Sequence, residues 1–229
     1  GGLSWIDRDT VYVYTDFGDG TLTSSGYPNI VKEWKRGTPL SAARVVYEGT
    51  NEDMYIAAYH DDTPGFERDF VSRTIAFYND ELYLRAADGS LRKIDVPNSV
   101  SKGVVREWLT LELREPWEVG GKTYKAGSLL VTKFDDFMTG KREFNVLFEP
   151  TDSTSLAGVT WTKNHVVLNV MDDVKNKLTV LTHGPSGWTR TPMSIGSLEF
   201  GTTSVGAVDA DESDAVWLTV TDFLTPTEL

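Results

Sequence analysis

The feature of this sequence that most restricts its fold is a segment that recurs along the chain. The stretch TSLAGVTWTKNHVVLNVMDD at 154–173 resembles TSVGAVDADESDAVWLTVTDF at 203–223, about 49 residues further on. The stretch SWIDRDTVYVYTDF at 4–17 resembles both, roughly three such periods earlier. A repeat of about 50 residues, with room for four strands, has the size of a propeller blade. The repeat therefore favours a β-propeller over a β-sandwich, which has many strands but no reason for such self-similarity.

The rest of the chain carries the strand signals that this fold requires. Short runs rich in Val, Thr, Tyr and Trp alternate with turn residues, and no stretch holds a helical period over three turns. Within 81–96, Asp88-Gly89 marks a hairpin because this dipeptide supplies the positive φ angles of a tight turn. The sequence thus predicts an all-β propeller of about five four-stranded blades. The blades are expected near 3–49, 50–99, 100–152 and 153–198, with a partial blade over 199–229.

The last predicted blade indicates that the propeller is incomplete. The segment 199–229 is too short for four strands and lacks the outer ones. Propellers normally close their ring by pairing the two ends of the chain, and an unpaired sheet edge invites association. We therefore expect this sequence to be a fragment of a longer protein.

Composition restricts the partners and the compartment. The chain has 34 acidic and 22 basic residues, which gives a net charge of −12. Such a chain repels phosphate backbones and anionic lipid, so neither nucleic acid nor a membrane is a predicted partner. It has no cysteine, and its apolar runs are short. A cytoplasmic location is expected, with the bacterial periplasm as the alternative.

One stretch, THGPSGW at 182–188, contains residues that suggest the active site of a serine hydrolase. The nucleophile elbow of α/β-hydrolases needs glycine on both sides of the serine because strand and helix pack closely there. Gly184 precedes Ser186, but Trp188 occupies the second glycine position, and a proline-containing segment follows instead of a helix. We interpret this stretch as a glycine-proline turn between two strands and predict no catalytic residue in this chain.

The histidines do not form a metal-binding pattern. His60, His165 and His183 have no partner at the spacing of a metal motif. His60 precedes Asp61 and Asp62, but neighbours on a strand point to opposite faces and rarely bind one ion together. The sequence therefore predicts neither a metal nor a cofactor.

Two aspartates stand side by side at three places, 61–62, 135–136 and 172–173. A glycosidase needs two carboxylates that face each other across the scissile bond. The pairs are expected at equivalent places in the blades, as are Asp16 and Asp222 of the TDF segments. Recurrence at the repeat period favours a structural role, in which each carboxylate caps a turn.

Two irregular segments are the candidates for contact with a substrate or with a further domain. The stretch DFGDGTLTSSGYP at 16–28 lacks the closing Glu of a calcium loop and the lysine of a phosphate loop. It and HDDTPGFERDF at 60–70 are best interpreted as long blade loops, where binding contacts concentrate. The residues selected in these loops are Asp16, Phe17, Tyr27, His60 and Phe66.

Longer stretches resemble a known family. The chain is similar to the propeller of bacterial prolyl oligopeptidase-like serine peptidases, in the same order and over essentially its whole length. The stretches that carry this resemblance are SGYPNIVKEWKRGTPLSAARVVYEG (25–49), REWLTLELREPWEVGGKTYKAGSLLV (106–131), SLAGVTWTKNHVVLNVMDDVKNKLTVLT (155–182) and AVDADESDAVWLTVTDFLTPTEL (207–229).

The resemblance implies a fold, a partner and a role. Members of this family join a seven-bladed propeller to an α/β-hydrolase domain, whose Ser, Asp and His triad cleaves short peptides after proline. The propeller covers the active site and restricts it to small peptides. This chain matches about four and a half blades, so the hydrolase domain is missing and no triad residue has a counterpart here. The implied partners are that missing domain and short proline-containing peptides.

Two other functions remain open at this point. A free-standing five-bladed ligand-binding propeller, such as a lectin or scaffold module, would bind its ligand without a further domain. A five-bladed glycosidase would use acidic residues at the channel.

Overall fold

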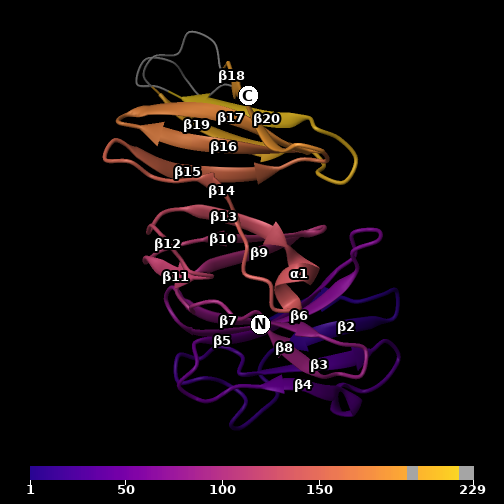
Figure 1. Ribbon diagram of the computed structural model, residues 1–229. Coiled ribbons are helices and arrows are strands. Elements are labelled where there is room, and N and C mark those ends of the chain that lie inside the picture. Colours follow the sequence, from indigo (N-terminus) through magenta and orange to yellow (C-terminus); the bar gives the residue numbers. More distant parts are fainter. Residues whose placement is uncertain (195–200, 222–229) are drawn as a thin grey trace. The chain divides into compact units, whose positions relative to one another are not determined.

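The computed structural model describes residues 1–194 and 201–221, and nearly all of its regular elements are strands. Four antiparallel sheets of four strands follow one another along the chain (Figure 1). Sheet 1 contains β1 (Gly2–Trp5), β2 (Thr10–Tyr14), β3 (Ile30–Lys35) and β4 (Arg44–Glu48). Sheet 2 contains β5 (Tyr55–Asp61), β6 (Arg68–Ala76), β7 (Asn79–Arg85) and β8 (Leu91–Lys93). In both sheets each strand pairs with the next one in sequence.

The later sheets follow the same plan with one insertion. Sheet 3 contains β9 (Ser101–Val105), β10 (Trp108–Glu112), β13 (Leu129–Lys133) and β14 (Asn145–Phe148). The small hairpin of β11 (Trp117–Val119) and β12 (Lys122–Tyr124) interrupts it between β10 and β13. Sheet 4 contains β15 (Thr154–Trp161), β16 (His165–Asp172), β17 (Lys175–Gly184) and β18 (Gly187–Met193). A further pair is formed by β19 (Thr202–Ala207) and β20 (Val216–Thr221).

The chain divides into two compact units. The first comprises Gly1–Leu111 and Thr132–Arg142, and the second comprises Glu112–Val131 and Glu143–Leu229. Among the residues that the structure describes, no helix is long and apolar enough to cross a membrane. The predicted all-β propeller fold is confirmed, while the residue boundaries of the blades stay a prediction.

The sequence repeat corresponds to the first hairpin of a sheet. Its copies coincide with β1–β2, β15–β16 and β19–β20. Trp5 pairs with Val11, and Trp161 pairs with Val166, so both tryptophans end the first strand of their sheet. The repeat therefore records one structural unit, in which the same alternation of apolar side chains forms the same pair of strands.

One element is a helix although its sequence has the apolar, Val- and Thr-containing composition of a strand. Within the run GSLLVTKFDDF at 127–137, β13 ends at Lys133 and the chain continues as the short helix α1 (Phe134–Met138). Phe134 and Phe137 are both buried, because residues three apart lie on one face of a helix. Burial of two aromatic rings therefore outweighs the local strand pattern.

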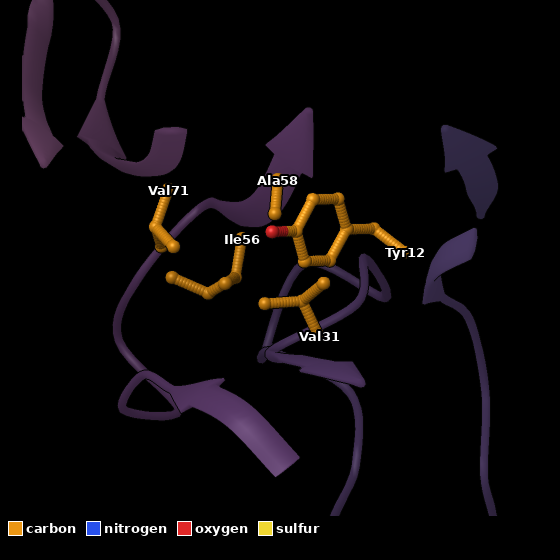
Figure 2. Close-up of a cluster of buried hydrophobic side chains, with 5 residues drawn as sticks. All are labelled: Tyr12, Val31, Ile56, Ala58 and Val71. Carbon is orange, nitrogen blue, oxygen red and sulfur yellow. The ribbon is translucent and has the colours of Figure 1, made fainter. Parts of the chain in front are cut away.

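The core of the first unit lies between sheets 1 and 2. Its central cluster consists of Tyr12, Val31, Ile56, Ala58 and Val71, all fully buried. Figure 2 shows the ring of Tyr12 beside Ala58 and Val31, with its hydroxyl turned toward sheet 2. The tyrosine ring thus contributes apolar packing, while its hydroxyl requires a polar partner across the interface.

Candidate functional site

The two candidate loops lie at opposite ends of the same strand. Segment 15–29 joins β2 to β3, and its Tyr27 packs on Tyr55, the first residue of β5. The second loop, 62–67, begins after Asp61, the last residue of β5. Seven extended residues span about 20 Å, so one surface patch cannot include both loops. The structure therefore does not bring the five selected residues together.

Asp16 and Phe17 stabilise the start of the first loop. Asp16 is exposed, and its Oδ1 accepts a hydrogen bond from the backbone N–H of Gly18 at 2.8 Å. The backbone N–H of Phe17 donates to Thr21 Oγ1 at 2.8 Å, and the Lys32 ammonium lies 4.2 Å from the centre of the Phe17 ring. These contacts are local turn contacts of the kind expected for an aspartate that caps a turn.

Tyr27 is the exposed aromatic residue of this loop, with 51% of its surface accessible. Its ring meets Tyr55 edge to face at 5.8 Å between ring centres, and Tyr55 meets Tyr14 in the same way at 5.9 Å. Burial and the nearby Tyr14 raise the pKa of Tyr55. The three rings form a small aromatic cluster that reaches the surface at Tyr27.

His60 is part of a strand, which corrects the prediction that all of 60–70 is a loop. It belongs to β5 and pairs with Asp69 of β6, whose Oδ1 lies 3.1 Å from His60 Nδ1. The same Asp69 oxygen accepts a hydrogen bond of 2.7 Å from the Tyr12 hydroxyl of sheet 1. Burial and this hydrogen bond raise the pKa of Tyr12, so its hydroxyl keeps its proton and donates a hydrogen bond to Asp69.

A row of polar residues extends this contact across both sheets. Asp69 pairs with Arg85 of β7, while Tyr12 pairs with Glu33 of β3 in the facing sheet. Arg85 Nη1 donates to the Tyr12 hydroxyl at 3.0 Å and to Glu33 Oε2 at 2.9 Å. We call His60, Asp69, Tyr12, Arg85 and Glu33 the interlock. Of these five residues only His60 was predicted from the sequence, because no local pattern places β2 and β3 against β6 and β7.

Phe66 lies in the second loop beside an arginine. Arg68 has its guanidinium 5.7 Å from the Phe66 ring centre and 4.7 Å from that of Phe134. Arg68 Nη1 also donates to the carbonyl oxygen of Arg106 at 2.6 Å. Phe66 therefore helps to hold Arg68, whose contacts join three segments of the first unit.

A second ionic group lies near the first loop and was missed by the sequence analysis. Asp53 is only 2% exposed, and its two oxygens accept hydrogen bonds from Arg73 Nε at 3.0 and 3.1 Å. Glu81 Oε2 lies 3.4 Å from Arg73 Nη1 and also accepts a hydrogen bond from Tyr83. Burial opposes ionisation of Glu81, but the bonds from Tyr83 and Lys93 outweigh it and lower the pKa of Glu81 to about 2.

The turn at 182–188 has the conformation that the sequence predicts. Gly184 pairs with Gly187, so Pro185 and Ser186 form a two-residue turn between β17 and β18. The next element is a strand instead of the helix that follows a nucleophile elbow. His183 packs on the ring of Trp188 at 5.2 Å.

The acidic pairs do not occupy equivalent places, contrary to the prediction. Pair 61–62 lies at the end of a first strand, 135–136 lies in α1 after a third strand, and 172–173 lies at the end of a second strand. The capping role holds for Asp61, whose Oδ1 accepts the backbone N–H of Thr63 at 3.0 Å. Asp222 lies outside the described residues. Within the described parts of the chain, no group of three His, Asp or Glu side chains is arranged to hold a metal ion.

Comparison with known sequences finds peptidases. No protein-family model matches the chain. An uncharacterised peptidase of Sinorhizobium fredii is 28% identical over 236 residues, which cover 99% of this chain and 32% of the relative. An uncharacterised peptidase of Rickettsia prowazekii is 29% identical over 196 residues, which cover 82% of this chain and 27% of the relative. The chain thus spans about a third or less of these relatives.

Comparison with solved structures finds enzymes that act on peptides. A post-proline cleaving enzyme from Rickettsia typhi matches 99% of this chain with a TM-score of 0.88 and 26% identity, and the match covers 34% of that enzyme. Oligopeptidase B from Trypanosoma brucei matches 99% of this chain with a TM-score of 0.68 at 15% identity, which supports the fold alone. The chain is a β-propeller segment that matches, over nearly its whole length, the propeller region of prolyl endopeptidases.

Proposed function

We propose that this chain is the non-catalytic, substrate-gating propeller part of a prolyl oligopeptidase-like serine endopeptidase that cleaves short peptides after proline. The observation that carries the proposal is the match to a post-proline cleaving enzyme across 99% of this chain, with a TM-score of 0.88. The matched region is 34% of that enzyme, which leaves room for a separate catalytic domain. The partner of this chain is then an α/β-hydrolase domain that carries the Ser, Asp and His triad.

Gating requires sheets that hold their positions against one another, and the polar contacts between sheets support this. In the first unit the interlock joins sheet 1 to sheet 2 through the 2.7 Å bond between Tyr12 and Asp69. In the second unit Asn169 Nδ2 donates to the carbonyl oxygen of Thr203 at 2.7 Å, which joins β16 to β19. Buried polar contacts have a strict geometry, so they resist sliding of one sheet over the next. A stiff wall excludes folded proteins, admits flexible peptides and shelters the reaction from water.

The experiment compares this chain with the longer protein that contains it. Both are incubated with a proline-containing chromogenic peptide and with a folded protein that contains the same cleavage sequence. We expect the isolated chain to release no product, and the longer protein to cleave the peptide but not the folded protein. A serine-directed fluorophosphonate probe should label the longer protein outside residues 1–229.

Gating itself is tested by loosening the interlock. In the longer protein, Asp69→Asn weakens the bonds from Tyr12 and His60 without removing a triad residue. We expect this variant to keep its rate on the short peptide and to gain activity on longer polypeptides. Turnover by the isolated chain, or a longer protein with no labelled serine, would contradict the proposal. Tight binding of a glycan or peptide by a native protein of this length would instead support a free-standing binding propeller.

A further inference from the structure

We propose that segment 134–142, which contains α1, is a releasable latch whose helix forms only while the segment is docked on sheet 2. This conformational device does not depend on the proposed function. The stretch Thr132–Arg142 groups with the first compact unit, while Glu112–Val131 before it and Glu143–Leu229 after it group with the second. The chain thus enters the first unit over this stretch and leaves it again, and the latch holds the chain there.

The helix of the latch is too short to be stable by itself. α1 has five residues, whereas an isolated helix needs roughly 12–15 residues in water. Lys133 precedes the helix, and a lysine side chain has no acceptor that could cap the first turn. The segment also continues the strand-like run that begins at Gly127. We therefore expect the segment to lose its helix when its contacts with sheet 2 are lost.

Phe134 provides the apolar part of the docking contact. Its side chain is buried, and its ring meets Phe70 of β6 edge to face, with 6.1 Å between the ring centres. The guanidinium of Arg68, which also belongs to β6, lies 4.7 Å from the centre of the Phe134 ring. Docking therefore buries an aromatic ring that release would expose.

Arginines bind the carboxyl end of the helix. Arg92 of β8 donates through Nη2 to the carbonyl oxygen of Met138, the last residue of α1. Arg142 Nη1 donates to the carbonyl oxygen of Phe137 at 2.9 Å, and its guanidinium lies 3.8 Å from the centre of the Phe137 ring. The last carbonyl groups of a helix have no partner within the helix, and cations beside them are stabilising. Because Arg92 belongs to sheet 2, it stabilises the end of the helix only in the docked state.

The same residues have an alternative conformation, which is a longer β13. The backbone N–H of Phe134, just after β13, donates to the carbonyl oxygen of Glu107, just before β10, at 2.8 Å. Because β13 lies next to β10 in sheet 3, this bond continues their pairing by one residue. The strand preference of the sequence and the helix favoured by burial therefore compete within one segment. Two competing conformations of one element are the physical basis of a conformational switch.

Hydrogen exchange followed by mass spectrometry measures the opening of the latch, in this chain and in the longer protein that contains it. In the docked state the backbone N–H groups of Thr139, Gly140 and Lys141 donate to carbonyl oxygens within the latch, at 3.0 to 3.2 Å. We expect the peptide that covers the latch to exchange about a hundredfold faster than the peptides of β6. Its rate should not change with urea below the unfolding transition, because local opening exposes little surface.

Substitutions of Asp135 test the competition between helix and strand. Its side chain is 88% exposed, so these changes alter conformational preference with little effect on packing. Asp135→Val favours the strand and should accelerate exchange of the latch about fivefold. Asp135→Glu favours the helix and should slow it about twofold. Asp135→Asn is the matched control, because it loses the same charge and the same 3.8 Å pairing with Arg68 but has a low strand preference.

Arg92→Met tests the bond to the end of the helix. We expect exchange of the latch to become about tenfold faster, while the peptides of β6 keep their rate. Arg36→Met removes an exposed arginine of sheet 1 and should change neither rate.

Three results would overturn the proposal. The first is a latch that exchanges as slowly as β6, because the segment would then open only when the whole unit unfolds. The second is an Asp135→Val variant that exchanges no faster than Asp135→Asn, because strand preference would then play no part. The third is an Arg92→Met variant in which β6 and the latch accelerate equally, because this would show a general loss of stability instead of release.

Discussion

The Tyr12 hydroxyl donates a 2.7 Å hydrogen bond to Asp69 Oδ1, although the two residues are 57 positions apart and belong to different sheets. The bond lies beside the apolar cluster that contains the Tyr12 ring. Asp69 also contacts His60, and Tyr12 also accepts a bond from Arg85. The polar interlock and the apolar core therefore both stabilise the interface between sheets 1 and 2.

Tyr12→Phe should destabilise the chain by about 1–3 kcal/mol. The substitution keeps the buried ring but removes the donor to Asp69 and the acceptor for Arg85. Urea unfolding at neutral pH measures the loss. Tyr27→Phe is the control, since Tyr27 is 51% exposed, and it should change stability by less than about 0.5 kcal/mol. Equal stability of both variants would show that the Tyr12 hydroxyl of the interlock does not stabilise the fold.

Gly49→Ala should destabilise the chain by about 1–3 kcal/mol through overpacking. A Cβ at this position would lie 2.6 Å from Asp53 Oδ2 and 2.7 Å from Ile56 Cδ1, both of which belong to buried residues. Gly206→Ala is the control, because a Cβ there meets no atom within 4 Å. Thermal unfolding of both variants tests this expectation, and a Gly49→Ala protein as stable as the Gly206→Ala protein would contradict it.

Glu81 should contribute stability that disappears in acid. Its pKa falls from the ordinary 4.5 to about 2 in the folded chain, because hydrogen bonds from Tyr83 and Lys93 outweigh its burial. A lowered pKa stabilises the fold above about pH 4.5, and this contribution is lost as the pH falls toward about 2. Glu81→Gln should therefore cost about 2–3 kcal/mol at pH 7 and almost nothing near pH 2.

The measurement is the free energy of unfolding in urea at a series of pH values, for the original chain and for Glu81→Gln. Glu118→Gln is a suitable control, because Glu118 is exposed in the small β11–β12 hairpin. The difference between the chain and Glu81→Gln should shrink with falling pH, and a difference that is independent of pH would contradict the role of the charge.

Asn169→Ala should destabilise the second unit by about 1–3 kcal/mol, because it leaves buried polar groups without partners. Asn169 donates to the carbonyl oxygen of Thr203 at 2.7 Å and accepts a bond of 2.7 Å from Asn176 Nδ2. Hydrogen exchange of the backbone amides in β19 should become faster. Asn145→Ala, at an exposed position of β14, should leave that exchange unchanged.

Elements set by short-range patterns could be predicted from the sequence. The repeat located the β15–β16 and β19–β20 hairpins, because apolar alternation and turn residues act over a few positions. The hairpin turn predicted at Asp88-Gly89 forms, and of these two residues Gly89 has the positive φ, at 84°. The family resemblance rests on the same stretches, and the comparisons agree with it.

The candidate site could be predicted only in part. Tyr27 is exposed in a loop as expected, but His60 lies in a strand and contacts residues of two sheets. Asp53 and Arg73 form an ion pair that no sequence motif predicts, because a salt bridge between residues distant in sequence leaves no local pattern.

The sequence by itself determined the all-β repeat architecture and the positions of the main hairpins, because strand and turn preferences depend on neighbouring residues. Only the tertiary structure decided that the loops of Tyr27 and Phe66 lie at opposite ends of β5, and that Tyr12 meets Asp69. It also turned Phe134–Met138 into a helix within a strand-like run. Those outcomes depend on the packing of one sheet against another, where burial and hydrogen bonding between distant residues outweigh local preference.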